Sequence, residues 1–313
     1  MAPNRLALIA NSHAGSRQAL DVVARARREL WGYEIDPILP KSAEELSKVC
    51  ETLSPKTHRA AVVIGGDGTL NVALQGLWKR ADGAAALPVY AFPGGTANDL
   101  AAELGIRPSF SQLQRLVDRR RPMKMDVITC NGTPFATVAG IGLGATLTQA
   151  VNDTRRDSKI LCSLMRTLKA EVYTALSAKT ILTRRSFLHQ VEIRSDAFSE
   201  RLRIAALFVC NQDHLGGDLK VGRNNRNSDG IFSVLVVPAG GPLSLLQTLM
   251  ELKSGRMPDD MITFTTRHLS IRSLENREIP VFGDGEVLLR SKSLEFEIHP
   301  ESLTVYREEG SHR

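Results

Sequence analysis

The chain has 313 residues, which is long enough for two modest domains, and 42% of them are hydrophobic and 24% charged, close to the averages of globular proteins. Lysine and arginine number 40 against 34 aspartate and glutamate, and the net charge of +6 favours an anionic partner: nucleotide phosphates, a membrane surface or nucleic acid. No apolar run approaches the roughly 20 residues of a membrane-spanning helix, and the N-terminus has no signal-peptide pattern, so we expect a cytoplasmic protein.

The first 120 or so residues alternate between strand and helix patterns. Short apolar runs predict strands, and apolar residues at helical spacing predict helices. The predicted strands are 5–10, 33–39, 60–64 and 88–92, and the helices after them cover 19–30, 42–53, 70–78 and a short segment ending near 105. This order predicts a parallel, doubly wound α/β sheet, in which ligands bind at the carboxyl ends of the strands.

Two glycine-rich corners follow the third and fourth predicted strands. They read Gly65-Gly66-Asp67-Gly68-Thr69-Leu70-Asn71 and Gly94-Gly95-Thr96-Ala97-Asn98-Asp99. Glycine allows a ligand to approach the backbone closely, and the N–H groups at the start of a helix favour an anion. The carboxylate of Asp67 repels a phosphate. We therefore expect Asp67 to bind a magnesium ion or a ribose hydroxyl at this site. One such corner can be an ordinary strand-to-helix turn, but two together predict a nucleotide site.

The pattern becomes mostly β from Met125 onward. An Asn131-Gly132 pair predicts a tight hairpin, and two helices interrupt the strands at 160–176 and 242–253. The predicted strands are 125–130, 135–139, 191–194, 203–210, 231–237, 262–272, 279–282, 287–290 and 294–299. These runs predict antiparallel sheet, and a last segment, 303–306, can pair with either sheet.

Several familiar sites have no motif in this sequence. It contains no G-x-x-x-x-G-K-[ST] run, no G-x-G-x-x-G opening the first helix, no H-x-x-x-H and no G-x-S-x-G. The four cysteines form no C-x-x-C pair, so neither a zinc site nor a disulfide framework is indicated, and we expect them to be buried as small hydrophobic residues.

Three motifs in order, the two corners and a later Asp284-Gly285-Glu286, resemble the catalytic domain of the diacylglycerol kinase family, which includes bacterial lipid kinases and sphingosine and ceramide kinases. The resemblance implies an α/β nucleotide-binding domain related to phosphofructokinase and NAD kinase, and an antiparallel β-sandwich domain that binds lipid. The first would cover residues 1–124, with 303–313 returning to it, and the second residues 125–302. ATP and Mg²⁺ would bind in the cleft between them.

The same resemblance implies the site residues. Glu286 would be the general base, with Asp284 beside it in the catalytic motif. A structural Mg²⁺ would be held by the side chain of Asp229 and the carbonyls of Arg226 and Ile231, although an Asp-Gly turn there needs no metal. ATP would bind Gly65, Gly66, Asp67, Gly68, Thr69, Leu70, Asn71, Gly95, Thr96, Asn98 and Asp99.

We therefore expect a lipid kinase that transfers the γ-phosphoryl group of ATP to a hydroxyl of a lipid such as diacylglycerol. We expect contact with a membrane surface and no nucleic-acid partner, and leave a homodimer open. The stretch 159–179 is basic and rich in leucine. It can lie on a membrane surface, line a lipid pocket, or form a helix that packs on the sandwich.

Two alternatives remain. One is a kinase of a soluble alcohol, as in NAD kinase, because the first corner is shared with that wider group. The other is a catalytically weak nucleotide or lipid sensor on the same scaffold. Val72 favours the sensor because the family usually has Asn-Glu where this chain has Asn71-Val72, and the first loop, Asn11-Ser12-His13-Ala14-Gly15, lacks the proline of the family pattern.

Overall fold

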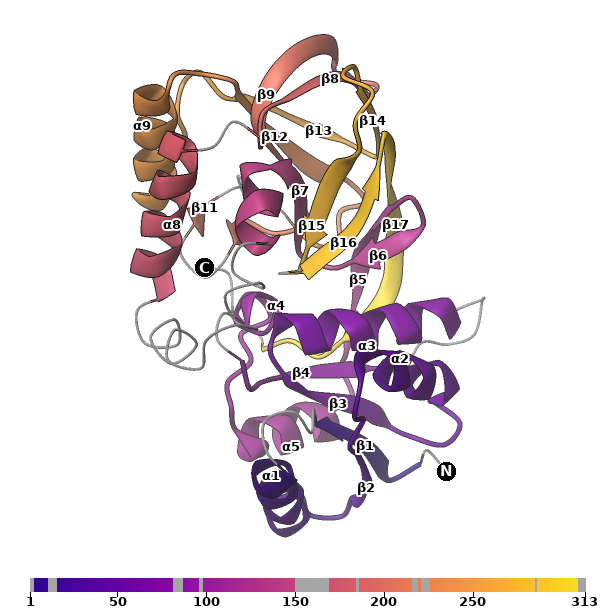
Figure 1. Ribbon diagram of the computed structural model, residues 1–313. Helices are drawn as coiled ribbons and strands as arrows, with labels where there is room; N and C mark the ends of the chain where they lie inside the picture. The colour runs from indigo at the N-terminus through magenta and orange to yellow at the C-terminus, as the bar shows by residue number, and fades with distance from the viewer. Residues whose placement is uncertain are drawn as a thin grey trace. The chain divides into compact units, whose positions relative to one another are not determined.

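The structure is a computed structural model, and the chain forms two compact units in it: residues 1–127 with 300–313, and residues 128–299 (Figure 1). The residues described are 3–10, 16–80, 87–95, 98–149, 169–183, 186–215, 219–220, 226–284 and 286–308.

Unit 1 is built on a parallel sheet. Its strands are β1 (Arg5–Ala10), β2 (Glu34–Ile38), β3 (Ala60–Gly65) and β4 (Val89–Pro93), in the order β2-β1-β3-β4. The first five residues of β3 are buried, as the uninterrupted apolar run predicts for a strand covered on both faces. The doubly wound α/β sheet expected from the alternating pattern is confirmed.

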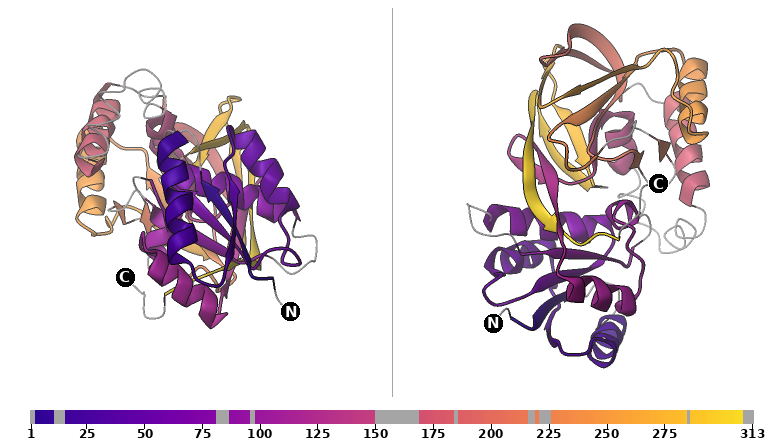
Figure 2. Two further views of the ribbon diagram at one scale, coloured as in Figure 1. Left: turned by 90° about the horizontal axis from the view of Figure 1, so that it is seen from below. Right: turned by 180° about the vertical axis from the view of Figure 1, so that it is seen from behind.

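Helices cover both faces of this sheet (Figures 1 and 2). Two of them, α1 (Ser16–Glu29) and α5 (Phe110–Arg119), contact each other on one face; α2 (Ala43–Thr52) and α3 (Asp67–Arg80) pack together on the other. The short α4 (Asp99–Glu103) follows β4. Sequence reasoning missed α5, although the apolar residues of this helix are regularly spaced.

Unit 2 is an antiparallel sheet with helices beside it, among them α8 and α9. Its main strand order is β16-β15-β7-β9-β8-β14-β17, with β12 pairing to β9 and β13 to β12. The predicted hairpin at Asn131-Gly132 is confirmed: both residues have positive φ, and Cys130 pairs with Thr133. The elements are β5 (Met123–Cys130), β6 (Thr133–Phe135), β7 (Val138–Gly142), α8 (Lys169–Thr183), β8 (His189–Arg194), β9 (Ser199–Cys210), β10 (His214–Leu215), β11 (Leu219–Lys220), β12 (Phe232–Pro238), α9 (Pro242–Lys253), β13 (Ile262–Thr266), β14 (His268–Ser273), β15 (Ile279–Gly283), β16 (Glu286–Ser291) and β17 (Ser293–Val305).

Two segments differ from the sequence expectation. The run 262–272 is not one strand: it divides at Arg267 into β13, which pairs with β12, and β14, which pairs with β8 and β17. Most of the predicted helix 160–176 lies outside the described residues, and its last part belongs to α8.

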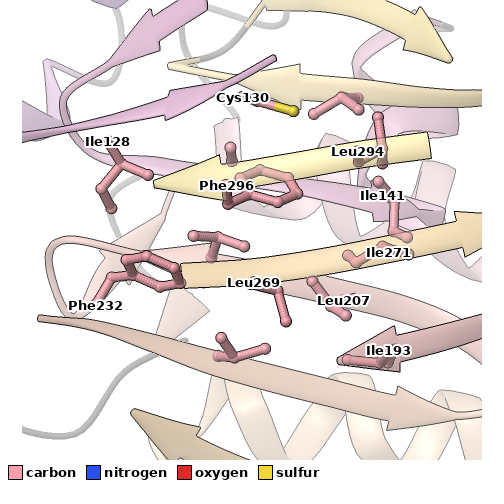
Figure 3. Close-up of a cluster of buried hydrophobic side chains, with 14 of the residues drawn as sticks. Ile128, Cys130, Ile141, Ile193, Leu207, Phe232, Leu269, Ile271, Leu294 and Phe296 are labelled. Atoms are coloured by element: carbon pink, nitrogen blue, oxygen red, sulfur yellow. The ribbon is translucent and has the colours of Figure 1, made fainter. Parts of the chain in front are cut away.

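Two apolar cores lie on opposite faces of β9 and β12. Because successive side chains of a strand point to opposite faces, Leu207 and Val209 of β9 join a core enclosed by strands (Figure 3), whereas Phe208 faces a second core. That second core also contains Ile181 of α8 and Leu245 of α9. Unit 2 therefore has one core between strands and another between the sheet and helices that include α8 and α9.

The chain returns to unit 1 at the end of β17. Val305 pairs in parallel with Val89 of β4, and the N–H of Tyr306 donates to the carbonyl of Val89 at 2.9 Å. Glu308 then accepts a hydrogen bond from Nε2 of Gln112 at 2.7 Å. These contacts make the last described residues part of unit 1.

The described cysteines are buried thiols. Cys50, Cys130 and Cys210 are each fully buried, as predicted, and burial raises the pKa of the Cys50 and Cys130 thiols to about 12. Cys162 lies outside the described residues.

No helix in the described part of the chain is long and apolar enough to cross a membrane.

Candidate active site

The two glycine corners lie side by side at the carboxyl edge of the parallel sheet. Gly65 at the end of β3 pairs with Pro93 at the end of β4, and the N–H of Gly94 donates to the carbonyl of Gly65 at 2.9 Å. The first corner leads directly into α3, whose first residue is Asp67. Neighbouring parallel strands therefore bring both corners to one place, as the sequence predicts.

Glycine is required at this junction for steric reasons. A Cβ on Gly95 would lie 2.2 Å from Cα of Gly66, which is backbone and cannot move aside as a side chain can. A Cβ on Gly65 would lie 2.6 Å from Cβ of Thr69. Gly94 and Gly95 are exposed, so the contact between the corners leaves their backbone accessible to a ligand.

Asp67 joins the two corners. One of its carboxylate oxygens accepts the N–H of Asn98 at 2.8 Å, and the other accepts the N–H of Asp99 at 2.7 Å. Asp99 begins α4, so a carboxylate from the first corner binds the N-terminus of the helix that follows the second. From the sequence we expected Asp67 to bind magnesium or a ribose hydroxyl, and this role was missed. The two partners are 31 and 32 residues away, so no local pattern indicates it.

Asn98 fixes the second corner from within. Its φ of 56° is in the left-handed region, which asparagine tolerates better than most residues. Its side-chain oxygen accepts the N–H of Gly95 at 2.9 Å, and its amide nitrogen donates to the carbonyl of Gly95 at 3.0 Å. Thr96 and Ala97, between them in the chain, lie outside the described residues, as does the first loop, 11–15.

Leu70 and Asn71 belong to the first corner's motif but are turned inward. Their exposed fractions are 7% and 3%, and the side-chain oxygen of Asn71 accepts a hydrogen bond from Gln75 at 2.8 Å. The N–H of Leu70 donates to the carbonyl of Gly66 at 3.0 Å. The side chains of these two residues are therefore buried, and that of Asn71 is hydrogen-bonded within α3.

In unit 2, Asp284 comes directly after β15, and β16 begins two residues later. Gly283 pairs with Glu286, and Asp284 has a φ of 48°. Glu286 is the first residue of β16. Gly285 and the side chain of Glu286 lie outside the described residues.

The side chain of Asp284 is buried and holds the connection between β6 and β7. It is 5% exposed, and its carboxylate accepts the N–H of Ala136 and the N–H of Thr137, each at 2.9 Å, as well as the hydroxyl of Thr137. Its own N–H donates to the carbonyl of Val138 at 3.1 Å. Sequence reasoning missed Thr137, because the contact spans 147 residues.

The predicted metal residues of unit 2 form a surface turn before β12. Arg226 and Asp229 are exposed, Gly230 has a φ of 73°, and a carboxylate oxygen of Asp229 accepts the N–H of Ile231 at 3.3 Å. The turn offers one carboxylate and backbone carbonyls as oxygen donors. Among the residues described, no group of three or more His, Cys, Asp or Glu side chains is arranged to hold a metal ion.

Comparison with known proteins identifies the family. Residues 5–130 match the family model described as the diacylglycerol kinase catalytic domain, and residues 137–307 match the one described as the YegS C-terminal NAD kinase beta sandwich-like domain. The chain belongs to the family of the second model, which covers more than half of it, and its first unit carries the diacylglycerol kinase catalytic domain. The second model describes a β-sandwich, so the fold expected from the sequence is confirmed in both parts.

Individual relatives are distant but cover almost the whole chain. Proteins of Pseudomonas syringae pv. syringae and Pseudomonas savastanoi pv. phaseolicola, both named "Probable lipid kinase YegS-like", are 28% and 29% identical, and each match covers 91% of this chain and 87% of the relative. A crystal structure of a diacylglycerol kinase from Bacillus anthracis has a TM-score of 0.75 at 21% identity, over 99% of this chain and 98% of the other. At that identity the structural likeness establishes the fold.

Proposed function

We propose that this protein is an ATP- and Mg²⁺-dependent kinase that phosphorylates a hydroxyl group of a lipid. The observation that carries the proposal is the joined pair of glycine corners at the ends of β3 and β4, whose backbone is exposed and fixed by Asp67. Such a cradle at the carboxyl edge of a parallel sheet suits a polyphosphate. Membership of a kinase family supports phosphoryl transfer, and the names of the relatives support a lipid acceptor.

The residues of both corners would bind ATP through different groups. Backbone N–H groups at the start of α3 and in the second corner would bind the phosphates, while Leu70 and Asn71 would act by supporting the helix. A carboxylate has about four lone-pair sites, so Asp67 can hold Asn98 and Asp99 and still accept a water of a hydrated metal ion. When bound, Mg²⁺ would offset the negative charge of the phosphates.

Unit 2 would supply the group that activates the acceptor. The lipid hydroxyl oxygen would form a bond to the γ-phosphorus, the bond from that phosphorus to the β,γ-bridging oxygen would break, and ADP would leave. Glu286, at the start of β16, would take the hydroxyl proton as general base. We assign Asp284 a positioning role, because its carboxylate already accepts three donors in a buried place.

The turn before β12 would hold a structural Mg²⁺ through Asp229 and the carbonyls of Arg226 and Ile231. An exposed carboxylate with carbonyl oxygens is a donor set that Mg²⁺ accepts, since this ion usually keeps several waters. This ion is separate from the one that would accompany ATP.

The test is a phosphorylation assay with the purified full chain, γ-labelled ATP, Mg²⁺ and a panel of acceptors: diacylglycerol, ceramide, sphingosine, glycerol and NAD. We expect labelled product from a lipid alcohol, and a loss of about 100-fold or more in Glu286→Gln. Glu297→Gln, an exposed glutamate of β17 in the same unit, is the matched control and should retain full activity.

Three results would contradict the proposal. Label on NAD or glycerol alone would indicate a kinase of soluble alcohols. Tight ATP binding without turnover on any acceptor would indicate a sensor. Equal activity in Glu286→Gln and the wild type would remove Glu286 from its role as general base.

A further inference from the structure

Three neighbouring strands of unit 2 bring distant residues together at one end. β7 lies between β9 and β15 and runs antiparallel to both (Figure 1). The start of β7 is therefore next to the ends of the other two strands. Asn211 comes directly after β9, and Asp284 comes directly after β15. Both contact Ala136 and Thr137, the two residues before β7, from 75 and 147 positions away in the chain.

Asn211 binds these two residues through their carbonyl groups. Its side-chain Nδ2 donates to the carbonyl of Ala136 at 2.9 Å, and its backbone N–H donates to the carbonyl of Thr137 at 2.8 Å. Asp284 accepts the N–H groups of the same two residues, each at 2.9 Å. The stretch 136–137 is therefore held from both sides, and we call Asn211 and Asp284 together the 136–137 clamp.

The side chain at position 211 has to be a hydrogen-bond donor. Ala136 and Asn211 are 2% and 1% exposed, so water does not replace a missing partner of the Ala136 carbonyl easily. A leucine has a similar size and no donor. An aspartate has the shape of asparagine, but in its ionised form it only accepts hydrogen bonds and would repel this carbonyl.

The conformation of Asp284 depends on the same stretch. Its φ of 48° lies in the left-handed region, which a residue other than glycine keeps only where neighbouring contacts stabilise it. Those contacts are the bonds from its carboxylate to Ala136 and Thr137, and its own N–H, which donates to the carbonyl of Val138 at 3.1 Å. If Asn211 no longer fixed the Ala136 peptide, the donors that hold Asp284 would move.

We propose that Asn211 is a positioning residue for phosphoryl transfer, which acts through the stretch 136–137 on Asp284 and on the start of β16. The inference rests on the proposed function, in which Glu286, two residues after Asp284, is the general base. Gly283, on the other side of Asp284 in the chain, pairs with Glu286. A general base has to lie within hydrogen-bond reach of the proton that it accepts, and a displacement of about 1 Å can cost about 100-fold in rate.

The first test is steady-state kinetics of the full chain with the lipid acceptor that the wild type phosphorylates. We expect Asn211→Leu to lower kcat by about tenfold to 100-fold. The KM for ATP should change by less than about twofold, because the proposed nucleotide residues belong to unit 1 and Asn211 belongs to unit 2. A residue that only stabilises the fold would lower the melting temperature and leave kcat of the folded enzyme unchanged.

The matched control is Thr266→Val in the same unit. Thr266 is 6% exposed, and its hydroxyl donates to a backbone carbonyl, that of His268, at 2.9 Å. This variant also loses a buried hydrogen bond to a carbonyl, but the bond is outside the 136–137 clamp. It should keep wild-type kcat and KM. Circular dichroism melts check that both variants fold.

Asn211→Asp tests whether the donor itself matters. When protonated, the new carboxyl can donate its O–H to the carbonyl of Ala136, and when ionised it cannot. Burial and the nearby carboxylate of Asp284 should raise the pKa of this carboxyl, so mild acid should restore the donor. The ratio of kcat in Asn211→Asp to kcat in the wild type should therefore rise about fivefold or more from pH 8 to pH 6, or equal about one throughout if the carboxyl stays protonated. The ratio for Asn211→Leu should stay low and constant.

Hydrogen exchange gives a readout that needs no turnover. The N–H groups of Ala136, Thr137 and Asp284 are all bonded within this region. We expect them to exchange about tenfold faster in Asn211→Leu than in the wild type, with exchange in β13 unchanged. If the wild type phosphorylates no acceptor and exchange is faster in this variant, the 136–137 clamp stands and the proposed function fails.

Full kcat in Asn211→Leu on an acceptor that the wild type phosphorylates overturns the inference and leaves the proposed function standing. So does an equal loss of kcat in Thr266→Val, which would reflect general destabilisation. An Asn211→Asp variant that is as impaired as Asn211→Leu at every pH would also overturn it, because the donor would then not be the group that matters. Unchanged exchange at Ala136, Thr137 and Asp284 would remove the clamp itself.

Discussion

His189 is a buried imidazole in a place that disfavours its charged form. The side chain is 2% exposed at the start of β8, and Nδ1 has no hydrogen-bond partner among the described residues. Burial, and to a smaller extent the positive charge of Arg277, lower the pKa of His189 to about 4, against a smaller opposite effect of Glu275. The folded protein therefore keeps this side chain neutral at pH values where the unfolded chain protonates it.

Stability should consequently fall in mild acid. Because the unfolded chain binds the proton near pH 6.5 and the folded chain only near pH 4, the free energy of unfolding should drop as pH falls through this window, by about 3 kcal/mol in total. Urea titrations followed by circular dichroism at pH 7, 6, 5 and 4 measure this slope. In His189→Gln that part of the slope should disappear, and identical slopes in the variant and the wild type would contradict the assignment.

At the scale of elements, the contact between the two glycine corners decides the geometry of the candidate nucleotide site. The strand ends are adjacent because β3 and β4 pair in parallel, and Asp67 then ties α4 to α3 through two hydrogen bonds. Each corner alone is a common turn. The candidate phosphate site forms only when the two corners are in contact. A methyl group at their junction should therefore disturb this site.

Gly95→Ala should separate the corners, because its Cβ would overlap the backbone of Gly66 at 2.2 Å. We expect a loss of about 1 to 3 kcal/mol in the free energy of unfolding and a drop in ATP affinity, measured by urea unfolding and by calorimetry. Gly241→Ala is the matched control, because a Cβ there meets nothing within 4 Å. If Gly95→Ala bound ATP as tightly as the control, the corners would not need their close contact.

Some helices and strands can be predicted from local sequence patterns, and others cannot. The strands of unit 1 and the hairpin at Asn131 have strong local signals, an uninterrupted apolar run and a turn pair that accepts positive φ. The missed helix α5 also has one: Ser109 accepts the N–H of Gln112, and Leu113, Leu116 and Val117 line its buried side. This cap and the apolar spacing are local signals for a helix, whereas the division of 262–272 depends on pairing with strands distant in sequence.

At the scale of the whole molecule, the chain closes unit 1 with residues that follow all of unit 2. Tyr306 is 2% exposed, and its ring centroid is 6.4 Å from that of Tyr90. Glu308 accepts hydrogen bonds from Gln112 and Arg115 of α5 and donates its N–H to the carbonyl of Leu104 at 3.0 Å. The last strand segment should therefore stabilise unit 1.

This can be measured selectively, because both tryptophans, Trp31 and Trp78, are in unit 1 and their fluorescence reports its unfolding. Tyr306→Ala should lower the free energy of that transition by about 3 to 5 kcal/mol, as expected for a fully buried aromatic ring. Phe296→Ala, a fully buried ring of β17 in unit 2, should lower the stability of unit 2 and leave the tryptophan transition in place. Equal shifts in both variants would mean that the two units unfold together.

The fold class, the family and the positions of the glycine corners can be predicted from the amino-acid order, because they depend on short-range patterns: apolar periodicity, turn residues and motif order. Three further features are seen only in the folded chain: Asp67 holds the second corner, Asp284 is buried against Thr137, and Leu243 of α9 is exposed. These outcomes depend on contacts between residues about 30 to 150 positions apart or on which side of a helix finds a core. Neither is encoded in the spacing of neighbouring residues.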